Sequence, residues 1–494
     1  MKLGHLPAGV PFRLYSLCAF FGLGSFLWGY NIGIITSIYV SPGWIVSLHH
    51  PSSSHKGLIT AIYYLGTWTS YIFISGAASD RIGRRYTALV GTVLTCVGAA
   101  VQTGARGHTA FAMMIIGRII CGFGNAMISS AVPLYLSEIA PAGKRGSLVV
   151  INHIGMVGGL SVAFWVGYGL SHWNGHTGFV ESWRLSVALQ FIPAVIFITG
   201  LPFCLETPRW LIEKGRIEEA RRSLQYLRGQ DGNPEAVEDE LHQIQQDIEL
   251  HHSEQKSPWT VLFTDRDLFA RLWRAALLQF MAQMCGSTAI KYYLPTNFLA
   301  LGLGKELSLL ASGIESSLKV ACTIMEMMII DKAGRRRTLI LGSVVMSIAL
   351  LLNGALPEAY PNNTNHASDY ACIVFIFFFS FGYSVGFGPN AWVYSTEIFP
   401  THVRALGLNV SASAGAIGSI VVAQIWPVAI QNIGSKTYYI FFSFNAASVI
   451  LLYVFYPETK GRTLEKMDSL FSRLSSDTER NPVERVEIVD EVKK

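Results

Sequence analysis

A series of twelve apolar runs is the feature of this sequence that most constrains its fold, because each run is long enough to cross a lipid bilayer. The hydrocarbon core is about 30 Å thick, so a helix rising 1.5 Å per residue needs roughly 20 apolar residues to span it. The runs lie near residues 14–36, 58–79, 87–104, 111–132, 147–169, 185–204, 272–294, 309–330, 338–356, 370–395, 406–428 and 438–456. Only 14% of the residues are charged, against roughly 25% in soluble domains. We therefore predict an all-α membrane protein with twelve transmembrane helices.

The longest segment between two runs divides the chain into two halves of six runs. This segment, 205–271, is strongly charged and has the periodicity of amphipathic surface helices over 216–228 and 235–250. We therefore expect four parts: an N-terminal six-helix bundle at 1–204, a cytoplasmic linker at 205–271, a C-terminal six-helix bundle at 272–456 and a cytoplasmic tail at 457–494.

The distribution of lysine and arginine predicts the orientation of the chain. In the short segments, 12 basic residues lie on the side that holds the N-terminus. Five lie on the opposite side, namely Lys56, Arg106, Arg184, Lys305 and Lys436. Short cytoplasmic loops carry an excess of Lys and Arg. We therefore expect a multi-pass protein of the plasma membrane with both termini and the linker in the cytoplasm.

The two halves carry the same charged signatures in the same order, after the second, fourth and sixth run of each half. The corresponding pieces are Asp80–Arg85 and Asp331–Arg336, Glu138 with Arg145 and Glu397 with Arg404, and Glu206 and Glu458. Six runs per half give both repeats the same topology. Such a duplication predicts two bundles that face each other across a central cavity at mid-membrane depth.

Acidic and arginine side chains at helix ends can form a charge network on one face of a membrane protein. On the cytoplasmic face, such a network would hold the bundles together when that side is closed and release them when it opens. The alternative is that the basic residues only mark the topology. The members of the predicted gating network are Asp80, Arg84, Arg85, Glu138, Arg145, Glu206, Arg209, Asp331, Arg335, Arg336, Glu397, Arg404 and Glu458.

Nine motifs in order, from Gly29 to about Glu465, closely resemble the sugar porter family of the major facilitator superfamily. The first half supplies Gly29-Tyr30, Gly76-x3-Asp80-x2-Gly83-Arg84-Arg85, Arg118-x3-Gly122-x-Gly124, Pro133-x-Tyr135-x2-Glu138-x2-Pro141-x3-Arg145-Gly146, Trp183-Arg184-x5-Gln190 and Glu206-Thr-Pro208-Arg209-Trp210-Leu211. The second half supplies Tyr292-Tyr293, Gly388-Pro389-x2-Trp392-x4-Glu397-x2-Pro400-x3-Arg404 and Pro457-Glu-Thr-Lys-Gly461-x2-Leu464-Glu465.

This resemblance implies the major facilitator fold, with two pseudo-symmetric six-helix bundles, and transport of a sugar or sugar-like solute by alternating access. Gly313-x5-Lys319 and the short first outer loop resemble the fungal branch of the family, which includes carriers for hexoses, disaccharides and quinate. We expect a functional monomer in a lipid bilayer, with a small-molecule substrate and without a cofactor, a metal ion or a nucleic-acid partner.

One departure from the family pattern bears on coupling. In the proton-coupled members an aspartate follows the tyrosine of the first span and pairs with the arginine of span 4. Here the position is Asn31, while Arg118 is retained. An amide does not titrate, and the facilitative glucose carriers of the family also have asparagine at this position, so we predict facilitated diffusion. The alternative role of Arg118 is that of a snorkelling residue near the outer end of its span.

The amides that bind sugar in the family are depleted here. His153 replaces a glutamine, Thr288 and Ser316 replace asparagines, and the Asn/Gln-Trp pair of span 11 becomes Gly415-Ala416, which would leave space for a larger or flatter substrate. An unmade hydrogen bond in a dry site costs about 1–3 kcal/mol, so glucose is a poorer candidate than in a typical member. The predicted substrate-binding residues are Asn31, His153, Gln283, Thr288, Lys291, Tyr292, Ser316 and Trp392.

Four further charges lie within the runs, namely Lys291, Glu315, Lys319 and Glu326. Charges inside a membrane are costly and usually face a cavity or a partner. The spacing of Glu315 and Lys319 predicts an i,i+4 ion pair. Lys291 has two interpretations: an anchor for a substrate carboxylate or phenolate, or a salt bridge to Glu315. His153 could titrate near neutral pH and take over the proton-carrying role, or simply form hydrogen bonds in the cavity wall.

Other classes of function are weighed against transport of a sugar. The fold also supports a carrier for a non-hexose ring compound or organic acid, such as a quinate-like acid, a uronic acid or a secondary metabolite, coupled to protons through another residue. It also supports a nutrient sensor, although 457–494 is short for a signalling tail. No nucleophile–base pair or metal-ligand motif indicates an enzyme. Asn362-Asn-Thr364 is an N-glycosylation sequon in a predicted outer loop.

The charge distribution generates a prediction about orientation. Epitope tags placed before Met1 or after Lys494 should be inaccessible to antibody in intact cells and become accessible after permeabilisation, because both ends lie on the basic, cytoplasmic side. A tag inserted next to Lys436, on the opposite side, serves as the positive control. Labelling of the C-terminal tag on intact cells would contradict the orientation.

Overall fold

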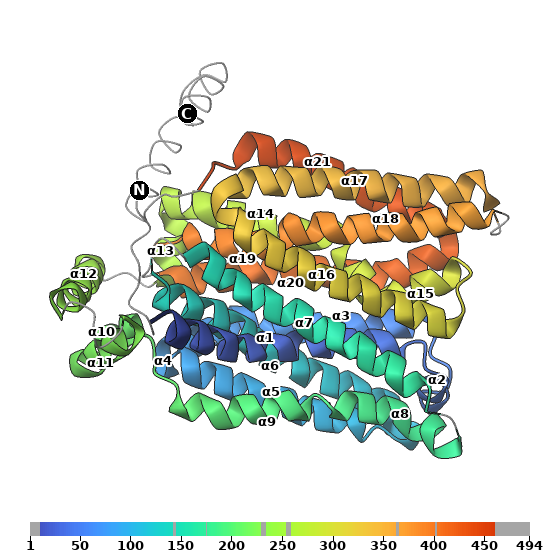
Figure 1. Ribbon diagram of the computed structural model, residues 1–494, viewed down its shortest axis with the longest axis horizontal. Coiled ribbons are helices and arrows are strands. Elements are labelled where there is room, and N and C mark those ends of the chain that lie inside the picture. Colours follow the sequence, from blue (N-terminus) through green and yellow to red (C-terminus); the bar gives the residue numbers. More distant parts are fainter. Residues whose placement is uncertain are drawn as a thin grey trace.

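The computed structural model describes residues 10–141, 145–173, 175–228, 234–252, 258–361, 365–400 and 403–459. Figure 1 shows long helices lying side by side with roughly parallel axes, and a group of short helices at one end. The long elements of the first half are α1 (Val10–Ile38), α3 (Ser53–Ser70) continued by η1 (Tyr71–Ser75) and α4 (Gly76–Ile82), α5 (Arg84–Thr103), α6 (Ala110–Ile139), α7 (Arg145–Ser171), and α8 (His176–Ala188) followed by α9 (Phe191–Gly200). A short α2 (Pro42–Ser47) follows α1.

The second half repeats this series. Its elements are α14 (Arg266–Met284) followed by α15 (Ser287–Ala300), α16 (Lys305–Ala333), α17 (Arg335–Ala359), α18 (His366–Val385) followed by α19 (Phe387–Glu397), α20 (Arg404–Ile433) and α21 (Thr437–Phe455). Ten segments are long and apolar enough to cross a membrane. One of them, Arg404–Phe455, contains two crossings, and the interrupted pair α14–α15 supplies the seventh. The helices thus account for all twelve predicted crossings.

Three of the predicted continuous spans are interrupted in the structure. Gly286 separates α14 from α15 with φ +96°, a left-handed conformation that glycine adopts without a Cβ clash. Gly386 separates α18 from α19 with φ −101° and ψ −100°. Leu189 and Gln190 lie between α8 and α9. The breaks are invisible in the hydropathy pattern because apolar residues continue on both sides of them.

The two halves contact each other reciprocally. The fifth crossing of the first half, α7, packs against α16, which is the second crossing of the second half. Conversely, α3, the second crossing of the first half, packs against α20, the fifth of the second half, while α1 packs against α15. This exchange of equivalent helices is the contact pattern that a pseudo-two-fold axis between the halves produces.

The linker forms a small helical unit of its own, shown in green at one end of the structure in Figure 1. It comprises α10 (Pro208–Glu213), α11 (Ile217–Arg228) and α12 (Pro234–His252), followed by α13 (Pro258–Thr264). The two predicted amphipathic helices are confirmed by α11 and α12, whose Leu224 and Leu241 are buried together with Trp210. The unit attaches to the first half, because the Arg228 guanidinium donates to the Ile139 carbonyl at 3.1 Å. The seventh crossing begins before the predicted residue 272, at the start of α14.

Glycine allows α1 and α7 to approach each other closely. A Cβ on Gly29 would overlap the Met156 carbonyl oxygen, and a Cβ on Gly159 would overlap the Phe26 carbonyl oxygen. Small residues at such crossings let helix backbones come into direct contact in a membrane. Any side chain at these two positions must therefore push the helices apart.

This packing predicts a large difference between two neighbouring glycines. Gly159→Ala should destabilise the protein by about 1–3 kcal/mol, the usual cost of overpacking, because the added methyl group meets main chain that cannot rotate away. Gly158→Ala is the matched control, since its Cβ would meet only Phe26 Cδ2, at 4.0 Å. Thermal unfolding in detergent should show a lower melting temperature for Gly159→Ala alone. Equal decreases in melting temperature for Gly158→Ala and Gly159→Ala would contradict the close approach of α1 and α7.

Candidate functional site

The predicted substrate-binding residues come from both halves. Asn31 (α1) and His153 (α7) belong to the first half. The C-terminal half supplies Gln283, Thr288, Lys291, Tyr292, Ser316 and Trp392, from α14, α15, α16 and α19. All are buried except Gln283, which is half-buried. The predicted site residues are therefore buried or half-buried polar, charged and aromatic groups contributed by both halves.

Asn31 and Arg118 are hydrogen-bonded in the interior of the first half. Arg118 Nη1 donates to Asn31 Oδ1 at 2.7 Å, and Asn31 Nδ2 donates to Gln190 Oε1 at 3.1 Å. The Arg118 guanidinium also lies 4.2 Å from the centre of the Tyr63 ring. Arg118 has an exposed fraction of 0%, so its alternative role as a snorkelling residue is wrong. Gln190 and Tyr63 are members of this site that the sequence analysis did not identify.

Gln283 and Thr288 lie on either side of the break in the seventh crossing. The Thr288 hydroxyl donates to Gln283 Oε1 at 2.8 Å, and the Ser287 hydroxyl donates to the Ala282 carbonyl at 2.7 Å. These bonds satisfy groups that the interrupted helix leaves without a partner. Gly415 packs against Gln279 of α14, whose carbonyl oxygen lies 3.2 Å from the position of an added Cβ. At Gly415 the α14 backbone therefore fills the space that the glycine would leave, whereas the extra space predicted at Ala416 stays a prediction.

The charges of the second half are arranged as one ion pair and one additional ammonium group. Lys319 Nζ lies 2.7 Å from Glu315 Oε1, which confirms the predicted i,i+4 pair, and the Ser380 hydroxyl donates to the same oxygen. Lys291 Nζ lies 5.4 Å from the centre of the Tyr383 ring. Within the described residues Lys291 forms no ion pair, so its predicted alternative bridge to Glu315 is not formed.

His153 lies at the contact between α7 and α19. Its Nε2 is only 2.7 Å from the position of a Cβ on Gly388, so the absence of a side chain there makes room for the ring. Both ring nitrogens are buried and have no hydrogen-bond partner among the described residues. The ammonium groups of Lys291 and Lys319 act electrostatically on this ring. A neutral imidazole offers one donor and one acceptor, and both are available here.

The remaining predicted residues have packing partners at the boundary. The Tyr292 ring packs edge to face on Tyr64 with centroids 5.8 Å apart, and the Trp392 ring packs in the same way on Trp28. The Ser316 hydroxyl donates to the Gly313 carbonyl at 3.0 Å. Tyr64 and Trp28 belong to the first half, so these ring pairs join the two halves.

Glu326 is buried at the contact between α16 and α19. Asn390 Nδ2 donates to Glu326 Oε1 at 2.8 Å and also to the Gly386 carbonyl at 2.8 Å. The second Glu326 oxygen is buried without a partner among the described residues. Asn390 therefore links this carboxyl group to the break between α18 and α19.

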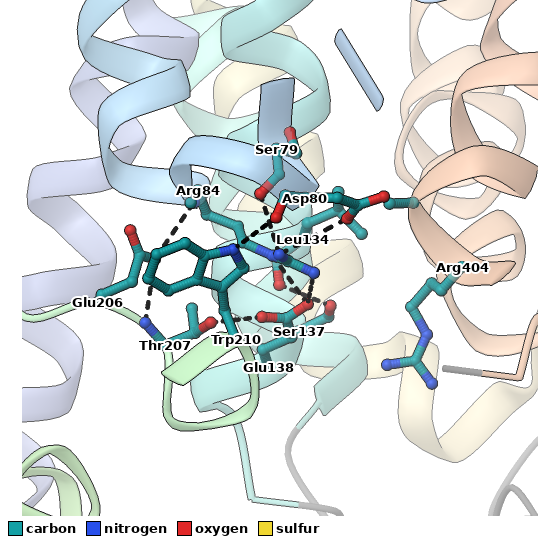
Figure 2. A network of polar contacts seen from close by, with 12 residues as sticks. Ser79, Asp80, Arg84, Leu134, Ser137, Glu138, Glu206, Thr207, Trp210 and Arg404 are labelled. Atoms are coloured by element: carbon teal, nitrogen blue, oxygen red, sulfur yellow. Dashed lines mark hydrogen bonds and ion pairs between the residues drawn. The ribbon is translucent and has the colours of Figure 1, made fainter. Parts of the chain in front are cut away.

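The predicted charge network forms within the first half. Figure 2 shows Arg84 in its centre, where the guanidinium donates to Glu138 Oε1 at 2.9 Å. The Thr207 hydroxyl donates to the other Glu138 oxygen at 2.6 Å. The main-chain N–H groups of Arg84 and Arg85 donate to the two Glu206 oxygens at 3.2 and 3.1 Å. The acidic groups thus tie the start of α5 to the end of α6 and to the linker.

The same network is repeated in the second half. Arg335 Nη2 donates to Glu397 Oε1 at 2.8 Å. The main-chain N–H groups of Arg335 and Arg336 donate to the Glu458 oxygens at 2.9 and 3.1 Å, and the Thr459 hydroxyl donates to Glu397. These bonds join helices of one half, whereas the sequence analysis placed the network between the halves.

The other members of the predicted network are placed as follows. Asp80 lies 3.7 Å from Arg84, and Arg209 lies in α10. Figure 2 shows Arg404 on the neighbouring second half, on the same side of the structure as the Arg84 network. The side chains of Arg145 and Asp331 and the sequon residue Asn362 lie outside the described part of the structure.

At the opposite end of the helices, tyrosines join the two halves. The Tyr39 and Tyr293 rings are stacked with centroids 6.0 Å apart, and the Thr36 hydroxyl donates to the Lys291 carbonyl at 3.0 Å. The Tyr293 hydroxyl donates to Thr60 at 3.3 Å. The helix ends away from the charge networks are therefore held together by direct contacts between the halves.

A cavity of about 240 Å³ lies at this end of the helices, between the start of α16 and the helices α1, α7 and α8. Its lining includes Ser37, Trp183 and Lys305. None of the predicted substrate-binding residues lines it. This cavity is therefore separate from the predicted substrate-binding site.

The buried pair of Arg84 and Glu138 generates a prediction. Arg84→Met leaves the Glu138 carboxylate, whose side chain is only 2% exposed, buried without its counterion, which costs about 3–5 kcal/mol. The double change Arg84→Met with Glu138→Gln should recover much of this loss, because the glutamine is neutral and still accepts from Thr207. Thermal unfolding of the single and double variants in detergent measures the difference. Equal decreases in the melting temperature of the single and double variants would contradict the uncompensated Glu138 charge as the cause.

Comparison with known proteins gives the family of the chain. A family model described as "Sugar (and other) transporter" matches residues 17–471. The chain is 28% identical over 482 residues to the MFS glucose transporter mfs1 of Aspergillus flavus, covering 93% of this chain and 90% of the relative. It is 29% identical over 479 residues to the quinate permease of Neurospora terricola, covering 93% and 89%.

Solved structures give the fold. The structure of the MFS proton:xylose symporter XylE bound to 6-bromo-6-deoxy-D-glucose superposes with a TM-score of 0.82 at 23% identity, covering 93% of this chain and 99% of that chain. This similarity confirms the predicted twelve-helix major facilitator fold. The chain therefore belongs to the sugar transporter family of the major facilitator superfamily, and it is a multi-pass membrane protein that transports a small molecule and is not an enzyme.

Proposed function

We propose that this protein moves a sugar-like ring solute across the plasma membrane by facilitated diffusion. The observation that carries the proposal is the hydrogen-bonded set of Asn31, Arg118 and Gln190. A proton-coupled carrier needs a group that binds and releases a proton during each cycle, and Asn31 is an amide. Its Oδ1 accepts from Arg118 and its Nδ2 donates to Gln190, so both ends of the amide are already occupied by partners.

The substrate class follows from the relatives and from the ring platforms at the boundary. The relatives carry the names glucose transporter and quinate permease, and glucose and quinate are both six-membered rings with several hydroxyl groups. Trp392 and Tyr292 offer apolar ring faces between the halves, and His153 offers unused hydrogen-bonding nitrogens. An apolar wall with a few polar groups is the usual character of a small-molecule site.

Alternating access fits the distribution of contacts at the two ends. At the outer end, tyrosines such as Tyr39 and Tyr293 join the halves directly. At the charged end, the networks around Arg84 and Arg335 hold each half together as a unit. Rigid halves with breakable contacts between them are what a rocking mechanism requires. We place the charged end in the cytoplasm, as the excess of short-loop Lys and Arg indicates.

The coupling proposal is tested by uptake in yeast cells that lack their own hexose carriers, with labelled glucose. Uptake should be saturable, reach equal concentrations on both sides and keep its initial rate when an uncoupler removes the proton gradient. Asn31→Asp adds a titratable acid beside Arg118 and should make the uptake rate depend on external pH. Asn31→Ala is the matched control, because it removes the amide without adding an acid.

Two results would overturn facilitated diffusion. The first is uphill accumulation of glucose by the unaltered protein that collapses with the uncoupler. The second is an uptake rate of the unaltered protein that depends on external pH as steeply as the uptake rate of Asn31→Asp. Absence of any saturable flux for every solute, with the protein present at the cell surface, would instead favour a sensor.

A further inference from the structure

Among the described residues, two buried cations of the site have no acidic partner: Arg118, which is hydrogen-bonded to Asn31 and packed on the Tyr63 ring, and Lys291. Glu315 is paired with Lys319 at 2.7 Å, and Glu326, about three helical turns further along α16, is bonded to Asn390. Lys291 is 6% exposed, and its Nζ lies 5.4 Å from the centre of the Tyr383 ring. In the described part of the chain, the Lys319 ammonium group repels it, and the Cys285 thiol and the His153 ring also interact with it electrostatically.

The Lys291 ammonium group is buried without a counterion among the described residues. Removing a charge from water is costly, and the cost is recovered only when an opposite charge or several hydrogen bonds replace the water. The face of one tyrosine ring offsets a small part of it. The protein retains the charge in the membrane interior, at the boundary between the halves, where a solute can supply the missing partner.

We infer that Lys291 binds the negative charge of the substrate, and that the substrate is a hydroxylated ring compound with a single carboxylate. This inference rests on the proposed function and adds the charge of the solute to it. Within the described residues, Lys291 is the buried ammonium group of the site without an acidic partner, and one carboxylate can supply that opposite charge. A phosphate ester carries about −1.5 to −2 charges at neutral pH, which is more than the Lys291 ammonium group alone neutralises. A neutral hexose would leave Lys291 without its partner.

His153 supplies the second contact and connects the substrate to the other half. Its two ring nitrogens are buried without partners among the described residues, and the ring lies against Gly388 of α19 in the second half. Lys291 belongs to α15 of the second half, and His153 to α7 of the first half. A solute with its carboxylate on Lys291 and a hydroxyl group on His153 therefore touches both halves. Binding of such a solute can therefore shift the equilibrium between the arrangements of the two halves.

This assignment has a consequence for the driving force. A facilitated carrier that moves a monoanion carries one negative charge per transported molecule. The membrane potential then sets the distribution of the solute, at about tenfold for each ~60 mV. A neutral sugar carried by the same protein is indifferent to the potential. A carboxylate carried together with a proton follows the pH gradient and is also indifferent to the potential.

The experiment uses the full-length protein in liposomes, with quinate and D-glucuronate as carboxylate probes and D-glucose as the neutral probe. A potassium gradient with valinomycin sets the potential, and internal and external buffers set the pH difference independently. With the inside positive by ~60 mV, the carboxylates should accumulate about tenfold, and glucose should equilibrate. Lys291→Met should raise the KM for the carboxylates about ten- to a hundredfold and change the KM for glucose less than about threefold.

Two control variants make the result specific. Lys291→Arg keeps the positive charge and should restore carboxylate transport. Lys305→Met removes a half-buried ammonium group at the outer cavity and should leave both kinds of KM unchanged. Stabilisation against thermal unfolding by each carboxylate, present for the unaltered protein and lost in Lys291→Met, measures binding without transport and shows that the variant is folded.

Each outcome supports or overturns a separate statement. Accumulation that follows the pH gradient, with a KM that still depends on Lys291, would overturn facilitated diffusion and support the carboxylate site. Equal KM changes for glucose and the carboxylates in Lys291→Met would overturn the carboxylate site. Transport of glucose alone, indifferent to potential and to Lys291, would overturn the carboxylate site and leave facilitated diffusion standing.

Discussion

The cost of placing a charge inside a membrane determines how the interior of this protein is arranged. Each buried cation has a specific environment: Arg118 binds the Asn31 amide and the Tyr63 ring, and Lys319 binds Glu315. Lys291 has only an aromatic face. Because the lipid offers no hydrogen bonds, each of these buried charges is held by a neighbouring amide, carboxylate or aromatic ring of the protein.

Each half of the duplicated chain contains an equivalent charge network. Arg84 with Glu138 in the first half and Arg335 with Glu397 in the second half have nearly equal distances, 2.9 and 2.8 Å. In both, a following glutamate accepts two main-chain N–H bonds at the start of a helix, where the helix dipole favours an anion. Each network stiffens one half. Among the described residues, the contacts between the halves include the packing of α7 on α16 and of α3 on α20, aromatic ring pairs and single hydrogen bonds.

Close packing of glycine complements these polar contacts. Gly29 and Gly159 bring α1 and α7 into backbone contact, while Gly388 makes room for the His153 ring between the halves. The first arrangement joins helices within a half, and the second places a polar ring at the contact between α7 and α19. Glycine therefore has two roles here, one in stability and one in the shape of the site.

The sequence by itself determined the membrane class, the twelve crossings, the repeat and the Glu315–Lys319 pair, because hydropathy and i,i+4 spacing are local properties. Only the tertiary structure decided the rest. The choice of Lys319 over Lys291 as partner of Glu315, the bond from Asn31 to Gln190, and the packing of Gly415 against Gln279 depend on which helices meet. The break at Gly286 also became visible only in the fold, since apolar residues continue on both sides of it. Contacts between distant segments are set by helix packing, which no local pattern encodes.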